Sequence, residues 1–142
     1  MPKAAPSLTL ALLQGREAVM AYFRPLLNKH NLTEQQWRVI RILKQAPDFT
    51  LESRDLAALA CILRPSLTGV LVRLEKAGHV HRWKPETDQR RLCVTLTDQG
   101  HEVFAQMSKG MNRQYQKIQQ RLGEDDYQTL MDLLSRLRDL QP

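Results

Sequence analysis

The sequence predicts a mainly helical α+β fold, a winged helix-turn-helix between long helices at the two ends of the chain. Apolar residues recur at helical spacing over most of the chain. A helix–turn–helix pattern occupies residues 55–71, and residues 80–96 change to the alternation of a β-hairpin. We therefore expect a single domain over 1–142, with the winged helix-turn-helix at about 33–97 and terminal helices at about 7–30 and 98–140.

Composition favours an anionic partner. The 142 residues carry a formal net charge of +6, which suits nucleic acid, an acidic membrane or an acidic protein. Two cysteines make no disulfide framework, and no long apolar run precedes Arg16. We expect a cytoplasmic protein without a signal peptide or membrane span, whose only flexible segment is residues 1–6.

The N-terminal part predicts two helices. The first carries a 3.6-residue stripe, followed by a second helix that Thr33 caps, with Gln36 at the spacing of a capping box. The stripe of the first helix consists of Leu12, Leu13, Val19, Met20, Phe23, Leu26 and Leu27. In the second helix, Trp37, Ile40 and Leu43 are expected to face the core.

Two short helices joined by a tight turn follow. Ser53 is a plausible cap for the first, Ala57 is small where the second would cross it, and Cys61 is a small turn residue. The second is predicted to run from Pro65 to about Ala77, where Gly78 ends it. Ile62 is expected to be buried after the turn, and the inward stripe of the second helix is Leu67, Val70, Leu71 and Leu74.

That stripe leaves a polar face formed by Arg64, Ser66, Thr68, Gly69 and Arg73. Gly69 costs roughly 1 kcal/mol of helix propensity relative to Ala, but it would let the backbone approach a groove closely. Such a face is what a recognition helix presents to the major groove and its phosphates. For this helix alone, a merely solvated surface is an equally good interpretation.

The hairpin strengthens the nucleic-acid interpretation. VHRW and RLCVTL alternate around the loop KPETDQR, with Leu92, Val94 and Leu96 expected to face the core. The segment from Arg64 to Arg91 has a net charge of +4, whereas residues 124–142 have −3. Positive charge therefore coincides with the helix-turn-helix and the hairpin.

At the hairpin tip, Arg90 is placed to enter a narrow minor groove. Asp88 either orients Arg90 or Arg91 through a charge-assisted bond or simply makes the turn. The complete predicted DNA-binding set is Ser53, Arg64, Pro65, Ser66, Thr68, Gly69, Arg73, Lys84, Asp88, Gln89, Arg90 and Arg91.

The terminal helices predict a homodimer. Thr97 caps a long helix that ends at Gly123, and acidic residues open the last helix. Both ends of the chain are more apolar than one small domain needs; Leu8, Leu10, Leu12 and Leu13 lack an obvious partner. Helices that join two subunits would set the ~34 Å separation between recognition helices that successive major grooves require.

Arg16 lies within the apolar stripe of the first helix, so we expect a buried guanidinium that needs a partner. The partner is either a carboxylate ligand, held bidentately, or an acid of the same dimer. The predicted ligand-binding residues are Arg16, Met20, Phe23, Trp37 and Arg38. Trp37, Met20 and Phe23 would form an apolar wall, and Arg38 is either a second anion contact or an ordinary exposed arginine.

Other classes are disfavoured. The chain has no glycine-rich phosphate loop, nucleophile elbow or paired carboxylates, so we expect no enzyme, no catalytic residues and no cofactor. His79 and His81 would share one face of a strand, but nearby DNA phosphates explain them as well as zinc, and no metal site is predicted. A protein-interaction module without DNA binding would explain the helices but not the charge.

The run LRPSLTGVLVRLEKAGHVHRWKPETDQRRLCVTLTDQG resembles the MarR family of bacterial transcription regulators. Its most specific part is Asp88-x-Arg90 followed by Leu96-Thr97-x-x-Gly100, and the order of elements matches along essentially the whole chain. Within the family, ALLQGREAVMAYFRP, NLTEQQWRVIRIL and ACILRPSLTGVLVRLEKAG are similar to repressors of aromatic-acid breakdown.

The resemblance implies a homodimer that binds a palindromic operator in double-stranded DNA and is released by a small aromatic acid. It further implies a repressor of a homoprotocatechuate (4-hydroxyphenylacetate) catabolic operon. The alternative is a MarR-type regulator of efflux, stress or virulence genes with a different effector. Thiol-sensing members carry a reactive cysteine near the start of the chain; none precedes Cys61 here, so peroxide sensing is not expected.

Overall fold

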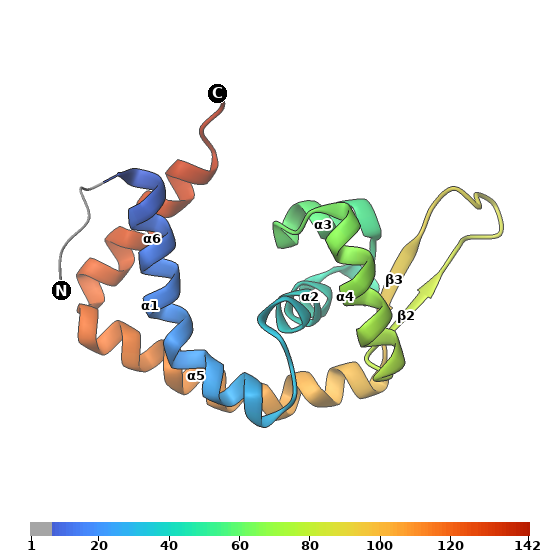
Figure 1. Ribbon diagram of the computed structural model, residues 1–142, viewed down its shortest axis with the longest axis horizontal. Helices are drawn as coiled ribbons and strands as arrows, with labels where there is room; N and C mark the ends of the chain where they lie inside the picture. The colour runs from blue at the N-terminus through green and yellow to red at the C-terminus, as the bar shows by residue number, and fades with distance from the viewer. Residues whose placement is uncertain (1–6) are drawn as a thin grey trace. The chain divides into compact units, whose positions relative to one another are not determined.

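The computed structural model describes residues 7–142 (Figure 1). Residues 1–6, which were expected to be flexible, lie outside the described residues. The chain forms two compact units, one of Arg24–Lys109 and one that combines the chain up to Phe23 with Gly110–Pro142. The elements are α1 (Leu8–Lys29), α2 (Glu34–Gln45), η1 (Pro47–Phe49), β1 (Thr50–Glu52), α3 (Ser53–Ala60), α4 (Arg64–Lys76), β2 (Val80–Trp83), β3 (Cys93–Leu96), α5 (Asp98–Leu122) and α6 (Glu124–Arg138).

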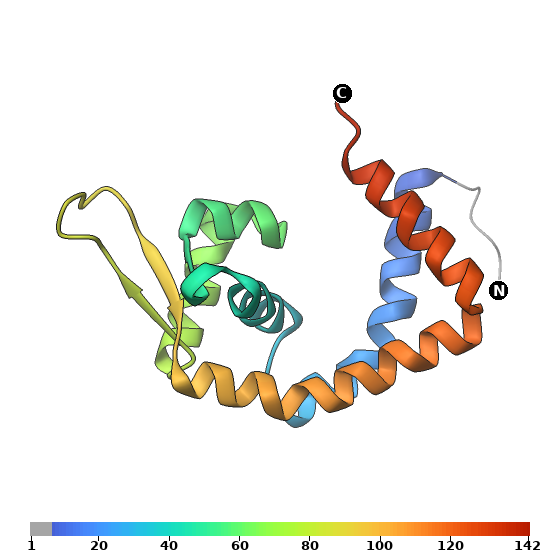
Figure 2. The same ribbon diagram turned by 180° about the vertical axis from the view of Figure 1, so that it is seen from behind.

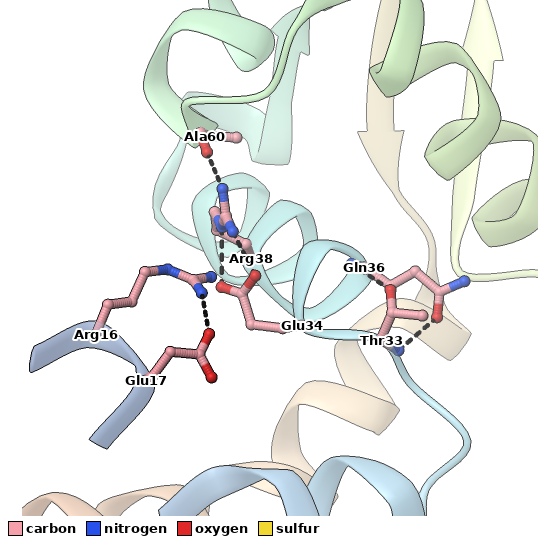
Figure 3. Close-up of polar contacts among 7 residues, drawn as sticks. All are labelled: Arg16, Glu17, Thr33, Glu34, Gln36, Arg38 and Ala60. Atoms are coloured by element: carbon pink, nitrogen blue, oxygen red, sulfur yellow. Dashed lines mark hydrogen bonds and ion pairs between the residues drawn. The ribbon is translucent and has the colours of Figure 1, made fainter. Parts of the chain in front are cut away.

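Helix α2 forms the centre of the Arg24–Lys109 unit. The Thr33 hydroxyl accepts the Gln36 N–H at 3.1 Å and the Gln36 side chain accepts the Thr33 N–H at 3.0 Å, which confirms the capping box (Figure 3). Trp37, Ile40 and Leu43 are buried as predicted. The ring of Trp37 stacks on Phe104 of α5 with centroids 5.5 Å apart.

Helices α3 and α4 form the helix-turn-helix. Their axes differ in direction by 105°, within the range of this motif. Cys61 takes a left-handed conformation, φ 54°, at the end of α3, which allows the chain to turn sharply. Ala57 and Ile62 are buried, and the predicted inward stripe of α4 is buried at every position: Leu67, Val70, Leu71 and Leu74.

The wing belongs to a three-stranded antiparallel sheet in the order β1-β3-β2. Strand β3 pairs with β2 through Val80↔Leu96 and with β1 through Leu51↔Val94. The hairpin of β2 and β3 extends beyond the helices of its own unit, as both views show (Figures 1 and 2). The pattern of the sequence does not reveal β1, which has only three residues and pairs far along the chain.

Three predictions of detail are wrong. Ser53 is the first helical residue of α3, and Glu52 occupies the cap position without a side-chain capping bond. Helix α4 begins at Arg64 rather than Pro65, because Pro fits either of the first helical positions. Leu92 is only partly buried, since β3 begins one residue later; Cys93, Val94 and Leu96 are buried instead.

The wing is locked to the start of α5. The Thr97 hydroxyl accepts the Gly100 N–H at 3.1 Å and donates to the Gly78 carbonyl at 2.5 Å, which confirms the predicted cap. A Cβ at Gly100 would lie 2.3 Å from the His79 carbonyl oxygen, so glycine is required there. Gly78 follows the end of α4 with φ +83°.

In the other unit, α1 and α5 are joined by aromatic contacts. The rings of Phe23 and Tyr115 lie 4.7 Å apart, and Arg121 donates to the Tyr22 hydroxyl at 2.8 Å. Helix α6 has no buried residue. Exposed leucines lie along α1 and α6: Leu8, Leu12, Leu13, Leu130, Leu133 and Leu134.

Within residues 7–142 no single helix is long and apolar enough to cross a membrane, although α3 and α4 taken together as a bent pair reach the required length and composition. The inward leucines of that pair are buried in the core of the unit.

Candidate DNA interface

The outward face of α4 is accessible along its length. Arg64, Ser66, Thr68 and Arg73 are exposed, whereas Gly69 is half-buried. Pro65 is also exposed, at the first turn. The helix therefore presents a row of donors and acceptors with a central position that has no side chain, the surface on which a major groove can be read.

An open hollow of about 620 Å³ lies between the start of α3, the start of α4 and the wing. It is lined by Glu52, Ser53, Arg54, Arg64, Asp88, Arg90, Arg91 and Leu92. A smaller recess of about 150 Å³ continues between α4 and the wing and shares Ser53, Arg64 and Leu92 with it. The lining has four arginines and two carboxylates, so it attracts anions.

Asp88 both makes the turn and orients an arginine, the two roles predicted for it. Its Oδ1 accepts the Arg90 backbone N–H and the Arg90 Nε–H, each at 3.1 Å. The first bond makes the turn and the second orients the arginine. The two Arg90 donors hold the pKa of Asp88 below its usual range. The Arg90 side chain remains 92% exposed, so the tip carries an oriented and accessible guanidinium.

Arg91 is held by a different carboxylate. Its Nε donates to Glu52 Oε1, and this hydrogen bond raises the pKa of Arg91. The other Glu52 oxygen lies 3.4 Å from Arg54 Nε. The remaining predicted wing residues are exposed: Gln89 donates to the Pro85 carbonyl at 2.9 Å, and Lys84 lies at the base of the loop.

Arg64 differs from the other arginines of the hollow. Among residues 7–142, no carboxylate is ion-paired with it. It also lies in the first turn of α4, where the helix dipole disfavours a cation and no acidic side chain compensates. A phosphate or a base edge would satisfy this guanidinium, and it is therefore the arginine of the site best placed to bind DNA directly.

The sequence interpretation missed Glu52 and Arg54. Glu52 lies in the unpredicted strand β1, and its partner Arg91 is 39 residues away. Arg54 left a usable signal, because it is a cation at the N-terminal end of a helix, where positive charge is unfavourable. Arg54 has Glu52 as a partner and Asp55 in the same turn, whereas the first turn of α4 has no acidic residue beside Arg64, which favours an anion from outside the chain.

Glu75 ties the recognition helix to the wing. Its Oε2 accepts the Arg82 backbone N–H at 3.0 Å, and its Oε1 accepts the Arg82 Nη2–H at 2.9 Å. The side-chain bond, followed by the backbone bond, lowers the pKa of Glu75. The wing and α4 are therefore held together by an ionised carboxylate.

We expect this tie to fail in acid. Because the folded-state pKa is depressed, the stabilisation is present above the unfolded-state pKa and is lost as pH falls through the folded-state value. The difference in thermal midpoint between the native protein and Glu75→Gln should shrink as pH falls from about 5 to about 3. Scanning calorimetry across that range measures it; a constant difference would show that the Glu75 charge does not stabilise the wing.

Gly69 has no internal reason to be glycine. A Cβ at this position would meet no atom within 4 Å. Gly69→Ala is therefore expected to stabilise the protein by about 0.5–1 kcal/mol and to weaken DNA binding, because the methyl group separates the backbone from the groove. Chemical denaturation and fluorescence anisotropy measure the two effects. Equal DNA affinity in the stabilised variant would remove close backbone approach from the binding mode.

The predicted ligand residues have different environments. Arg16 is not buried as expected: its side chain is 46% exposed and lies 3.9 Å from Glu17 (Figure 3). Arg16 is exposed because few residues of the same chain pack against this part of α1. On the same helix, Met20 is half-buried and Phe23 is buried.

On α2, the Trp37 ring is buried and stacks on Phe104. Arg38 is held by Glu34, which accepts its Nε–H at 3.0 Å and also its Nη2–H, and by the Ala60 carbonyl at 2.5 Å (Figure 3). Arg38 therefore ties α2 to the end of α3. Within residues 7–142, no group of three His, Cys, Asp or Glu side chains could hold a metal ion.

Comparisons with known proteins agree with this geometry. A model of the MarR family matches residues 32–92. The HTH-type transcriptional regulator FarR of Neisseria gonorrhoeae is 47% identical over 135 residues, 95% of this chain and 91% of FarR. The homoprotocatechuate degradative operon repressor of Escherichia coli is 48% identical over 128 residues, 90% of this chain and 85% of the repressor.

A solved structure extends the likeness. The crystal structure of NadR in complex with 4-hydroxyphenylacetate has a TM-score of 0.82 and 45% identity, covering 99% of this chain and 100% of the NadR chain. MarR-family regulators are DNA-binding proteins and not enzymes. By identity close to one half over nearly its whole length, and by its winged helix-turn-helix, this chain belongs to the MarR family and is a DNA-binding transcription regulator.

Proposed function

We propose that this chain is a cytoplasmic homodimeric repressor of an aromatic-acid catabolic operon, of the homoprotocatechuate and 4-hydroxyphenylacetate type, and that a small aromatic acid releases it from a palindromic operator. The observation that carries the proposal is the extent of two similarities. A repressor named for the homoprotocatechuate operon and a structure named for bound 4-hydroxyphenylacetate are each nearly half identical to this chain over nine tenths of it or more.

In the proposed DNA complex, α4 enters the major groove and its outward face reads the bases. The wing follows the backbone and places Arg90 in the adjacent minor groove. The hollow between them fits a phosphate backbone, because arginines from α3, α4 and the wing converge on it. The DNA-binding residues are those of the predicted set, with Arg54 added.

The proposed effector site uses the charged and apolar residues of α1. Arg16, Met20 and Phe23 share one face of α1 and grade from an exposed cation to a buried ring. A carboxylate attached to an aromatic ring has the matching order of charge and apolar surface. Trp37 and Arg38 remain part of the proposal, although both already have partners within α2, α3 and α5. The effector must bind the DNA-free state more tightly than the DNA-bound state in order to release the operator.

Arg16→Ala is expected to keep operator affinity within about twofold, since surface substitutions have small effects, and to abolish release by aromatic acids. Glu17→Gln is a matched control, because it removes the carboxylate that lies 3.9 Å from Arg16 and leaves the guanidinium in place. Anisotropy with operator DNA and rising concentrations of 4-hydroxyphenylacetate measures both properties. Normal release of the Arg16→Ala variant would remove Arg16 from the effector site.

The experiment that tests the proposal measures binding to the upstream DNA of the chain's own gene, with and without 4-hydroxyphenylacetate and its 3,4-dihydroxy relative. Tight binding that either acid reverses supports the whole proposal. Tight binding that neither acid affects would reject the effector and the operon. That result would favour regulation of other genes with another effector, an alternative kept open by the equally high identity to FarR.

A further inference from the structure

Five arginines of the Arg24–Lys109 unit contact carboxylates in two different ways. Arg38 and Arg82 each donate through Nε and a terminal nitrogen to one carboxylate, so the fold fixes the orientation of their guanidinium groups. At the hollow, Arg90 and Arg91 each donate a hydrogen bond to a carboxylate through Nε, and the shortest contact of Arg54 with a carboxylate is an ion pair of 3.4 Å through Nε. Their terminal amino groups are left for other acceptors.

Glu52 contacts two of these three arginines. It is the last residue of β1 and pairs with Cys93 in the ladder, so its backbone position is fixed. One carboxylate oxygen contacts Arg91 and the other contacts Arg54. Next to it, the Ser53 N–H donates to the Leu92 carbonyl at 2.8 Å. Glu52 therefore joins α3 to the base of the wing on a rigid sheet edge.

A carboxylate in a DNA-binding hollow has an electrostatic cost, because it repels phosphates. The geometry indicates what offsets that cost. Holding an arginine by Nε reduces the side-chain entropy that binding would otherwise remove, and it fixes the plane of the guanidinium. The Glu52 side chain is 20% exposed, whereas those of Arg91 and Arg54 are 47% and 68% exposed. The acid is therefore covered and its arginines face solvent.

We propose that Glu52 is a positioning residue for DNA recognition: it orients Arg54 and Arg91 by their Nε groups so that their terminal amino groups bind backbone phosphates in one register. The inference rests on the proposed mode of DNA binding. It makes a prediction opposite to that of simple electrostatics. Removing the negative charge should weaken binding to a specific site, while binding to unrelated DNA should stay the same or become tighter.

The test compares Glu52→Gln with Glu86→Gln. Glu86 is an exposed carboxylate of the wing loop with no ion pair among the described residues, so its variant makes the same change in charge without releasing an arginine. The DNA is a duplex that the native protein selects from a random-sequence library, together with a scrambled duplex of equal length. Affinities are measured by anisotropy at one fixed salt concentration.

We expect Glu52→Gln to lose roughly tenfold in affinity for the selected duplex, the scale of a lost charge-assisted hydrogen bond, and nothing for the scrambled duplex. Glu86→Gln should lose affinity for neither. In an Arg54→Gln, Arg91→Gln background, Glu52→Gln should change specific affinity by less than about twofold, because no arginine is left to orient.

Equal or tighter binding of Glu52→Gln to the selected duplex would overturn the positioning role and leave DNA binding intact. So would equal losses for the two duplexes, since that result indicates a damaged fold. The positioning role would also be overturned if Glu52→Gln lost as much affinity for the selected duplex in the Arg54→Gln, Arg91→Gln background as in the native protein. If the native protein selects no duplex at all, the proposed function fails first, and the inference fails with it.

Discussion

Arg64→Ala is expected to weaken operator binding more than any other single change on α4. A lost arginine contact to a base or phosphate costs about 1–3 kcal/mol. In a symmetric dimer the substitution removes two such contacts. The combined loss corresponds to between about 30-fold and about 10⁴-fold in Kd. Anisotropy titrations of the native protein and the variant measure it.

The reason for choosing Arg64 is that nothing within the described chain satisfies it. Arg54, Arg90 and Arg91 each have a carboxylate partner, whereas Arg64 has none and stands at the unfavourable end of a helix dipole. The native fold therefore contains an uncompensated cation, and binding of an external anion should stabilise the folded protein. Arg64→Ala should be at least as stable as the native protein, so a loss of DNA binding will not reflect unfolding.

Arg113→Ala is the matched control, because Arg113 is an exposed arginine of α5 in the other unit. It makes the same change in net charge at a residue that does not line the hollow. If the two variants lose DNA affinity equally, the effect is one of total charge, and Arg64 makes no direct contact. The salt dependence gives a second readout: losing one phosphate contact in each subunit should reduce its slope by about two.

The helices of this fold could be predicted because their signals are local. Apolar residues at 3.6-residue spacing, the Thr33 capping box, the turn at Cys61 and the glycines at 78 and 123 each act within a few residues. The inward stripe of α4 was correct at every position for the same reason. The remaining positions of α4 formed the predicted polar face, and all of its residues except the half-buried Gly69 are exposed.

Features that depend on distant residues could not be predicted in this way. Strand β1 is three residues long and exists because β3 pairs with it. Glu52 acquires its contact with Arg91 through that pairing, and no spacing in the sequence marks it. Arg16 shows the opposite error. Its place within an apolar stripe predicted burial. An apolar stripe does not reveal whether residues of the same chain pack against it, and the Arg16 side chain is half exposed.

Leu13→Glu is expected to separate the proposed dimer. Leucines of α1 and α6 are exposed in the single chain, although a protein of 142 residues is large enough to bury them. An interface between two copies would bury them, and the same substitution would then occur on both sides of it. A buried, unpaired carboxylate costs about 3–5 kcal/mol, so the dimer Kd should rise by at least about 10³-fold.

Leu59→Glu provides the comparison, because Leu59 is 62% exposed and Leu13 is 56% exposed. Leu59 lies on α3 in the Arg24–Lys109 unit, so the same change there should leave the dimer intact. Analytical ultracentrifugation across a range of concentrations measures both. Since the two recognition helices must be held about 34 Å apart to bind successive grooves, a monomeric Leu13→Glu variant should also lose operator binding. Dimers of equal strength in the two variants would show that the leucines of α1 do not form the interface, and the spacing of the recognition helices would then have to be set by another surface.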